Sequence, residues 1–288
     1  MTKIIAEIGC NHMGDMTIAR KMVSVIAHFC EAHVVKFQKR NNRELLTPEQ
    51  YNAPHPVPEN AFGPSYGQHR EALEFSVEQH LELKGHCERE GLVYSCSVWD
   101  LASAREIAEL NPQFIKVPSA SNLHFAMLDH LCSHYAGKIH ISLGMTTNDE
   151  MESIVSYMEQ RGRACDTVLY ACTSGYPVKA EDVCLLEIAA LRERFIRRVG
   201  GFGFSGHHLG IALDVAAATL GADWIERHFT LDRTWKGTDH AASLEPDGLR
   251  RLCRDVDAVG KALVRKREEL LPVETVQRRK LKWVPSDV

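Results

Sequence analysis

The sequence predicts a single-domain α/β protein, a (β/α)8 TIM barrel, and three observations support this prediction. Short apolar runs alternate with segments of helical periodicity eight times along the 288 residues, which indicates a parallel sheet. Eight such units at this length fit a closed barrel better than an open doubly wound sheet. Neither GxGxxG after the first apolar run nor GxxxxGK(S/T) is present, which argues against nucleotide-binding folds of those kinds. No shift of composition marks a second domain, so one barrel domain is expected over residues 1–288.

The eight strands are expected where short apolar runs lead into polar loops. In the second run, Lys36 and Gln38 alternate with apolar neighbours, so they share one face of the strand. The strands, with the first loop residues after them, are expected at 4–9, 34–38, 91–97, 114–122, 138–145, 167–173, 202–208 and 223–230.

The helices are expected between these strands, and several carry recognisable boundaries. Thr147 followed by Glu150 forms a capping box. Asn111-Pro112 ends the preceding helix, and Gly221 stands where the helix at 209–221 would stop. In that helix one face is shared by Ile211, Val215, Ala218 and Thr219. The helices are expected at 16–32, 77–90, 101–110, 123–132, 147–160, 180–194, 209–221 and 246–269.

Two segments depart from the regular alternation. Residues 39–76 are long, polar and proline-rich, and a loop of that length in a compact domain is usually a lid or a binding loop. Tyr66, His69 and Arg70 lie near its end. After the last helix, residues 270–288 are expected to form a basic tail.

Bulk properties exclude several functional classes. A net charge of −4 and a pI near 6.4 provide no basic field for nucleic acid or an anionic membrane. The chain has no apolar run long enough to span a membrane and no charged-then-apolar leader, so we expect a cytoplasmic protein. Nine cysteines without a CxxC pair predict free thiols.

In a barrel of this kind, side chains just beyond the strand ends meet at one mouth, where such barrels place their sites. Here that set is unusually polar. It comprises Glu7, Asn11, His12, Lys36, Gln38, Ser95, Ser97, Lys116, Ser119, Ser121, Asn122, Ser142, Thr173, Ser174, Tyr176, Ser205, His207, Glu226 and His228.

The two lysines in this set need counter-charges, because an unpaired buried ammonium group is costly. Glu7 and Glu226 are expected to neutralise part of their charge, and a bound phosphate or carboxylate with serine hydroxyl donors would complete it. The alternative is that Lys36 and Lys116 are paired internally and are purely structural.

His207 and His228 each follow a predicted strand, with one predicted helix between the two. If those strands are parallel neighbours, both imidazoles lie at one edge of the sheet, which is a common way to hold a catalytic divalent metal. The alternative is that each histidine caps a loop.

Eight motifs in order along nearly the whole chain resemble those of the sialic acid synthase family. They are AEIGCNHMGD (6–15), VKFQ (35–38), IKVPS (115–119), SLGM (142–145), CTSGYP (172–177), FSGH (204–207), IERHFT (225–230) and GTDHAASLEP (237–246).

This resemblance implies an enzyme that condenses phosphoenolpyruvate with an aldose such as N-acetylmannosamine, using Mn²⁺ or Mg²⁺ held by His207 and His228. It implies phosphoenolpyruvate contacts at Lys36, Lys116, Ser119, Ser142 and Ser205, and sugar contacts at Gln38, Tyr176 and Asp239. Glu7 and Glu226 are further catalytic candidates, and Glu226 could instead support the metal or form a salt bridge. The expected assembly is a homodimer.

Three departures from the family pattern affect the acceptor end of the site. Ser121 stands where members often carry an acidic residue, and Ser174 replaces an asparagine; both remain candidate substrate contacts. Members also continue into an antifreeze-like domain that contributes an arginine to the partner's sugar site, and this domain is not expected here. The segment 39–76 is the candidate replacement lid, with Arg70 taking the place of that arginine. The alternative is that Arg70 pairs with Glu71 or Glu74.

Three functions therefore stand side by side. The first is a sialic-acid-like synthase. The second is a phosphoenolpyruvate-dependent synthase with a different, smaller or non-acetylated aldose as acceptor. The third is a sugar- or phosphate-binding barrel without catalysis, which the intact histidines and lysines disfavour.

Overall fold

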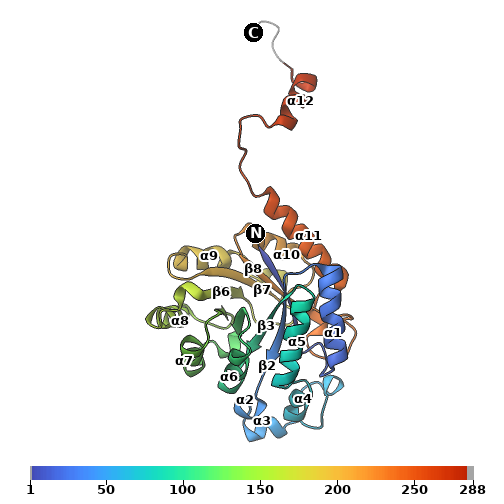
Figure 1. The fold of residues 1–288 in the computed structure, drawn as a ribbon, viewed down its shortest axis with the longest axis vertical. Coiled ribbons are helices and arrows are strands. Elements are labelled where there is room, and N and C mark those ends of the chain that lie inside the picture. Colours follow the sequence, from blue (N-terminus) through green and yellow to red (C-terminus); the bar gives the residue numbers. More distant parts are fainter. Residues whose placement is uncertain (1, 284–288) are drawn as a thin grey trace.

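The computed structural model describes residues 2–283, and it confirms the predicted barrel (Figure 1). Eight parallel strands close in the order β1 to β8, with β8 hydrogen-bonded to β1. The strands are β1 Lys3–Gly9, β2 Val34–Lys39, β3 Val93–Val98, β4 Phe114–Val117, β5 Lys138–Ser142, β6 Thr167–Cys172, β7 Gly201–Gly206 and β8 Trp224–His228.

Helices connect the strands and form the outer layer. Their caps follow the sequence signals: the predicted capping box of Thr147 and Glu150 begins α8. The helices are α1 Met16–Val25, α2 Asn42–Leu45, α3 Pro48–Asn52, α4 Tyr66–Ala72, α5 Val77–Arg89, α6 Leu101–Glu109, α7 Phe125–His134, α8 Asn148–Gln160, α9 Leu186–Phe195, α10 Ala212–Thr219, α11 Pro246–Ala262 and α12 Pro272–Leu281.

Side chains that point outward from the strands join one apolar core with the helices, because alternate residues of a strand face opposite sides of the sheet. A second, smaller cluster fills the barrel interior. It consists of Ile5, Val34, Phe114, Val168, Tyr170 and Trp224. This plug closes the barrel below the polar mouth.

The strand register places the polar mouth residues at neighbouring levels. Glu7 lies opposite Lys36 of β2 on one side and opposite His228 of β8 on the other. Ser97 lies opposite Lys116, and Ser205 lies opposite Glu226. The predicted parallel pairing of the strands that precede His207 and His228 is confirmed by this register.

The segment 39–76 is not the irregular loop that its prolines suggested. It contains α2, α3 and α4, which lie together at the end of the barrel opposite the N-terminus (Figure 1). Asn41, Thr47 and Ser65 cap these helices, and Pro48 occupies a first-turn position where its missing N–H costs nothing. Two of the prolines, Pro48 and Pro58, therefore begin a short helix and a 3-10 turn here.

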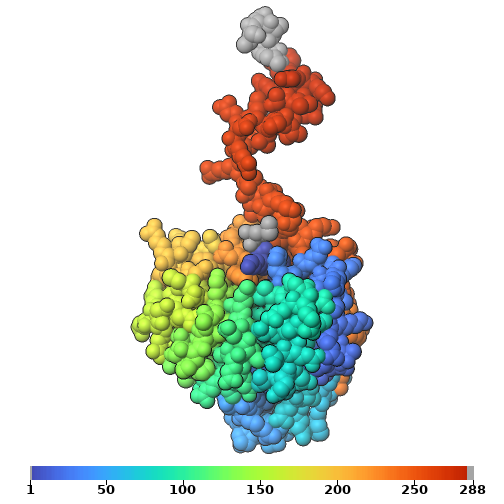
Figure 2. Space-filling view, in the orientation of Figure 1, coloured from blue at the N-terminus to red at the C-terminus, as the bar shows by residue number. Residues whose placement is uncertain are grey.

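The C-terminal helix is shorter than predicted. α11 ends at Ala262, and α12 follows after an extended linker, so that an arm projects from the end of the barrel where the N-terminus lies (Figures 1 and 2). Val273 and Val276 of α12 are exposed, so no core contact holds this helix against the body. Residues 284–288 of the predicted basic tail lie outside the described residues.

Two helices of the second half also differ in detail. The helix expected at 180–194 begins at Leu186, after a short 3-10 turn. In α10 the buried residues are Asp214, Ala217 and Ala218, whereas Ile211, Val215 and Thr219 are less buried. Asp214 forms an ion pair with Arg227 of β8, and both side chains are fully buried.

No helix within residues 2–283 is long and apolar enough to cross a membrane. The nine cysteines are all free thiols, as predicted.

Candidate active site at the carboxyl ends of the strands

The polar mouth forms a cavity of about 300 Å³ that is lined from all eight strands or the loops that follow them. Most of the candidate site residues line it. The lining residues are Glu7, Lys36, Gln38, Ser97, Trp99, Lys116, Pro118, Ser119, Ala120, Ser142, Met145, Cys172, Ser174, Tyr176, Ser205, His207, Glu226 and His228.

At the floor of the cavity, two lysines and two glutamates form a closed network. Lys36 pairs with Glu7, and its amine lies 3.7 Å from Oε1 of Glu226. The Lys116 amine lies 2.8 Å from Oε2 of Glu226 and 3.6 Å above the Tyr170 ring. The positive charges are thus balanced by carboxylates, as in the internal-pairing alternative. The inference that the lysines lack sufficient counter-charge is wrong, because Glu7 meets Lys36 on the neighbouring strand and Glu226 reaches Lys116 across the barrel.

The pKa shifts in this network show which groups can exchange a proton. Burial raises the pKa of Glu7, and Lys36 opposes this only in part. Burial would also raise the pKa of Glu226, but Lys116 and Lys36 together hold it below its usual range. Burial lowers the pKa of Lys116, with Glu226 acting against the shift. In this network, Glu7 is therefore the carboxyl group that gains a proton most easily, and Lys116 is the ammonium group that loses one most easily.

A set of hydroxyl groups lines the side of the cavity next to this network. The Gly144 amide donates a hydrogen bond to Ser119 Oγ at 3.0 Å, and Ser205 Oγ donates to Glu226 Oε1 at 3.2 Å. A Cβ at Gly144 would lie 2.4 Å from Ser174 Oγ and 2.8 Å from Ser119 Oγ. The missing side chain of Gly144 thus leaves room for a concave, hydroxyl-lined wall that suits an anionic oxygen group.

The two candidate metal ligands meet at the opposite side of the cavity. The ring centroids of His207 and His228 are 5.6 Å apart, and the Tyr176 ring lies 4.3 Å from that of His207. His207 Nδ1 lies 3.2 Å from the Thr173 carbonyl oxygen, so it carries the proton and leaves Nε2 with a free lone pair. Burial, and next the proximity of His228, lowers the pKa of His207 to about 4. The neutral ring this favours is the form that binds a metal.

The donor set fits a divalent ion held by two imidazoles. His228 Nδ1 is buried without a hydrogen-bond partner and lies 4.0 Å from Asp239 Oδ2. Residues 2–283 contain no group of three or more histidine, cysteine, aspartate or glutamate side chains arranged to hold an ion. Two protein ligands would leave the remaining positions of such an ion to substrate oxygens and water.

Three of the expected substrate contacts, Ser121, Asp239 and Arg70, do not line the cavity. The same holds for five other residues predicted at the mouth: Asn11, His12, Ser95, Asn122 and Thr173. Ser121 Oγ donates to the Trp99 carbonyl oxygen at 2.7 Å and is turned away from the mouth, because the chain forms a 3-10 turn there. Asp239 lies beside His228 at the rim. Arg70 lies on α4, and its alternative role is contradicted: Glu71 pairs with Arg43 and Glu74 with Arg40.

Five lining residues were missed by the sequence analysis: Trp99, Pro118, Ala120, Met145 and Cys172. Trp99 directly follows β3, and Met145 follows β5 by three residues. Cys172 is the last residue of β6 and lies two positions after the inward-facing Tyr170, so it faces the same side of the strand. The period-two pattern could therefore have identified it. Trp99 and Met145 lie in loops, where no periodicity indicates which way a side chain points.

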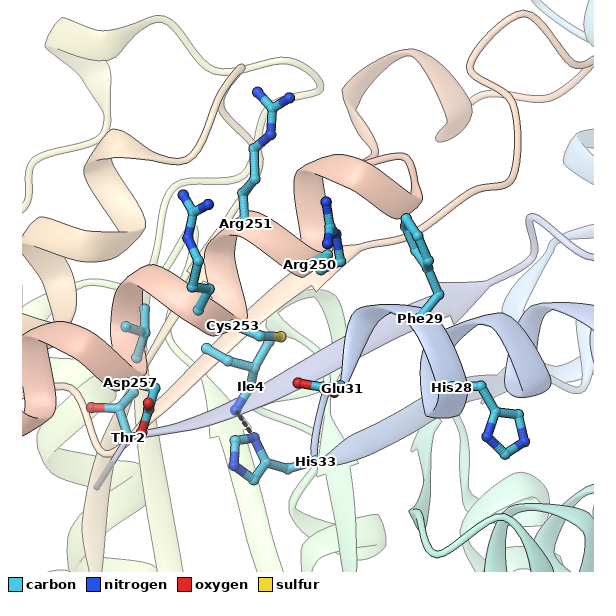
Figure 3. A pocket seen from close by; sticks show the side chains of 12 residues that line it. Thr2, Ile4, His28, Phe29, Glu31, His33, Arg250, Arg251, Cys253 and Asp257 are labelled. Atoms are coloured by element: carbon cyan, nitrogen blue, oxygen red, sulfur yellow. Dashed lines mark hydrogen bonds between the residues drawn. The ribbon is translucent and has the colours of Figure 1, made fainter.

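A larger cavity, of about 560 Å³, lies at the other end of the barrel between β1, the segment after α1 and α11 (Figure 3). The Ile4 amide donates to His33 Nδ1 there, and Arg250 lies over the Phe29 ring. Arg251 points away from the other labelled side chains (Figure 3). Because this cavity lies at the amino-terminal ends of the strands, away from the convergent polar groups, the mouth is the better candidate site.

The chain is similar to several known proteins. The NeuB family profile matches residues 22–268. The chain is 38% identical over 283 residues to the N-acetylneuraminate-9-phosphate synthase of Homo sapiens, covering 96% of this chain and 76% of that protein. It is 33% identical over 263 residues to the N,N'-diacetyllegionaminic acid synthase of Campylobacter jejuni, covering 91% and 77% of the two chains.

Solved structures show the same relationship. The N-acetylneuraminic acid synthetase of Leptospira borgpetersenii, crystallised with citrate, superimposes with a TM-score of 0.81 at 26% identity, covering 97% of this chain and 92% of that one.

Proposed function

Since this chain belongs to the NeuB family, we propose that it condenses phosphoenolpyruvate with an aldose to give a 2-keto-3-deoxy sugar acid and phosphate. The observation that carries the proposal is the cavity in which the charge network, the hydroxyl wall and the histidine pair face one another. The relatives make products of the same general kind, which differ in acyl groups and in whether a phosphate is present. The acceptor is therefore an acylamino aldose or a related sugar.

Phosphoenolpyruvate would bind at the floor and the hydroxyl wall. Lys36 and Lys116 offer ammonium groups to its carboxylate and phosphate, and Ser119, Ser142 and Ser205 offer hydroxyl donors. Because the lysines are already paired with Glu7 and Glu226, a bound anion shares them with these carboxylates. The raised pKa of Glu7 lets that carboxyl take up a proton and so reduces repulsion of the anion.

The acceptor would bind between Gln38, Tyr176 and the histidine pair. The enol-ether methylene carbon attacks the open-chain aldehyde, a C–C bond forms, and the aldehyde oxygen takes up a proton. Water adds to the cationic carbon that carries the phosphate and loses a proton, and phosphate leaves with cleavage of the C–O bond. Glu7 is positioned to accept or return a proton, while Glu226 holds the lysines in place. The barrel thus contributes mainly positioning and electrostatic stabilisation.

A divalent metal, Mn²⁺ or Mg²⁺, is part of this proposal. His207 and His228 would hold it, and when bound it supplies Lewis-acid polarisation of the aldehyde. The proposal also includes a homodimer, which sedimentation measurements on the full chain would test. Asp239, at the rim beside His228, is placed to contact the acceptor or to orient the imidazole.

The direct test measures phosphate release from phosphoenolpyruvate with Mn²⁺ and a panel of aldoses. Release that depends on N-acetylmannosamine or a related acylamino sugar supports the proposal. Release with a non-acetylated or smaller aldose alone would assign the second candidate acceptor. Absence of release with every aldose, while phosphoenolpyruvate still binds in calorimetry, would show a binding barrel and overturn the proposal.

A further inference from the structure

The two histidines of the candidate metal site are held by the backbone in different ways. His228 is the last residue of β8, and it lies opposite Glu7 of the neighbouring strand β1. His207 lies one residue beyond the end of β7, and the ladder between β7 and β8 stops at the pair of Gly206 and Arg227. Strand pairing between β7 and β8 thus ends before His207 is reached.

The Arg227 side chain continues this connection beyond the ladder. Because successive residues of a strand point to opposite faces, Arg227 lies on the outer face of the barrel while His228 lines the mouth. Its Nη2 donates to the His208 carbonyl oxygen at 2.5 Å, and its Nη1 donates to the Gly210 carbonyl oxygen at 2.8 Å. One guanidinium group of β8 therefore binds the main chain that directly follows His207.

A carboxylate from the helix layer holds this guanidinium in place. Asp214 of α10 forms an ion pair with Arg227. His208 Nε2 completes the cluster, since it lies 3.1 Å from Arg227 Nη1 and 3.2 Å from Asp214 Oδ2. All three residues are buried. A buried ion pair often adds little net stability, because the cost of desolvating its charges offsets their attraction. What this cluster contributes is therefore better judged from the positions that it fixes.

The cluster lies on the other side of the barrel wall from the histidine pair. His208 follows His207 in sequence, and Arg227 precedes His228. Each partner of the outer contact is thus the neighbour of one imidazole of the inner pair, whose ring centroids are 5.6 Å apart. A movement of residues 208–210 away from β8 would reach His207 through a single peptide unit.

Two hydrogen bonds of His207 come from the opposite side. Its Nδ1 lies 3.2 Å from the Thr173 carbonyl oxygen, and its own carbonyl oxygen accepts from the Val178 amide at 3.0 Å. Both partners belong to the loop after β6, which neighbours β7 on the side away from β8. The contacts of Arg227 complement them, because they join the loop of His207 to the strand of His228.

We propose that Arg227 is a positioning residue for the metal: fixed by Asp214, it holds the loop after β7 against β8 and so sets the spacing of the two imidazoles. This rests on the proposed function, which assigns the metal to His207 and His228. An ion with only two protein ligands depends closely on their separation, because metal–nitrogen distances of about 2 Å leave little room for adjustment. Loosening the outer cluster should therefore lower metal affinity.

The first test uses Arg227→Lys, which keeps a positive charge opposite Asp214 but replaces the planar fork with a single ammonium group. The fork geometry that serves the carboxylate and two carbonyl oxygens together is then lost. Electron paramagnetic resonance titration of free Mn²⁺ should show affinity reduced by about 10- to 100-fold, the usual effect of changing a group behind a metal ligand. Phosphoenolpyruvate binding without metal, measured by calorimetry, should not change. Wild-type Mn²⁺ affinity in this variant overturns the inference.

A double variant separates positioning from folding. Arg227→Met combined with Asp214→Leu removes both buried charges, and apolar replacement of a buried ion pair often preserves stability, which urea unfolding checks. Mn²⁺ affinity should still fall by the same factor, because the carbonyl oxygens of His208 and Gly210 have lost their donor. Affinity that returns to the wild-type value together with stability would show a merely structural role. An equal loss of phosphoenolpyruvate affinity would also overturn the inference, since the whole mouth would then have changed.

The matched control is Arg163→Met. Arg163 likewise donates to main-chain carbonyl oxygens, to that of Tyr135 at 2.5 Å and that of Gly137 at 2.6 Å, and it pairs with Asp166. It precedes β6 at the amino-terminal end of the barrel, so its loss should leave Mn²⁺ affinity unchanged. A loss of affinity as large as that of Arg227→Lys would show that metal binding merely follows stability.

A crystal structure of the double variant separates this inference from the proposed function. If the wild-type chain binds no Mn²⁺, the metal assignment of the proposed function fails, but the spacing of the two rings can still be measured. A separation of the His207 and His228 ring centroids clearly greater than 5.6 Å would support the positioning role. An unchanged separation would overturn it, whatever the activity of the wild-type chain.

Discussion

The Lys116 amine of β4 lies 2.8 Å from Oε2 of Glu226 of β8, and this ion pair crosses the barrel above the Tyr170 ring. Glu226 also approaches Lys36, so one carboxylate holds two lysines at the floor of the mouth. The pair spans 110 residues of sequence. It sets a carboxylate beside both ammonium groups in a buried site, where an incoming anion would share them.

Lys116→Met should weaken phosphoenolpyruvate binding by about 2–5 kcal/mol, because it removes one partner of a desolvated charge pair. Lys36→Met should act in the same range. Calorimetry with phosphoenolpyruvate alone measures the change. Lys138→Met is the control, since Lys138 is exposed at the start of β5. Unchanged affinity in both floor variants would refute the assignment of the lysines to this substrate.

His228→Asn should weaken Mn²⁺ binding by at least about 100-fold, since it removes one of two imidazole ligands. His207→Asn should have a similar effect. Electron paramagnetic resonance titration of free Mn²⁺ follows the binding without reference to turnover. Treatment with a chelator should abolish phosphate release in the wild-type chain, and added Mn²⁺ should restore it. Mn²⁺ affinity that survives both substitutions would show that these rings do not hold the ion.

Gly144→Ala should impair phosphoenolpyruvate use, because its Cβ would collide with Ser174 Oγ and Ser119 Oγ. A cost of about 1–3 kcal/mol in transition-state stabilisation is expected from such overpacking. Steady-state kinetics should show the loss in kcat/KM for phosphoenolpyruvate. Gly260→Ala in α11 serves as the control, because a Cβ there meets nothing within 4 Å. Equal kinetics of the two variants would count against the hydroxyl wall as a binding surface.

Acid should destabilise the fold in part through His80. Burial lowers its pKa to about 3, against about 6.5 in the unfolded chain. Below about pH 6.5 His80 binds a proton in the unfolded state, whereas in the folded state it stays neutral down to about pH 3. The free energy of unfolding therefore falls as pH decreases toward 3, by up to about 1.4 kcal/mol per pH unit from this group. Above pH 6.5 the contribution vanishes.

His80→Gln should remove this contribution to the pH dependence of the free energy of unfolding. Urea unfolding between pH 7 and pH 4 measures it for both chains, and the difference between their unfolding free energies should change with pH. Parallel pH dependences would mean that His80 does not control this part of the acid response.

Much of the site could be predicted because its residues follow strands. Lys36, Lys116 and Glu226 lie within strands and His207 directly follows one, and parallel strands bring these residues together at one mouth. The prediction failed where the direction of a side chain depends on which hydrogen-bond partner it finds. Ser121 also follows a strand, yet its hydroxyl satisfies the Trp99 carbonyl within a 3-10 turn.

The segment 39–76 shows the same limit on a larger scale. Its prolines indicated a loop, but Asn41, Thr47 and Ser65 supply caps that start short helices. Arg70 was expected to reach either a sugar or a neighbouring glutamate. The tertiary structure excludes Glu71 and Glu74, because Arg43 and Arg40 already occupy them.

The sequence by itself determined the barrel, the order of its strands and which side chains meet at the mouth, since these depend on local periodicity and on the shared direction of parallel strands. The tertiary structure alone decided which charges pair. Glu226 meets Lys116 across the barrel, and Arg70 is left without an acid although two stand near it in sequence. The physical reason is that an ion pair depends on register and on competition among all neighbours in space, and neither is encoded by spacing along the chain.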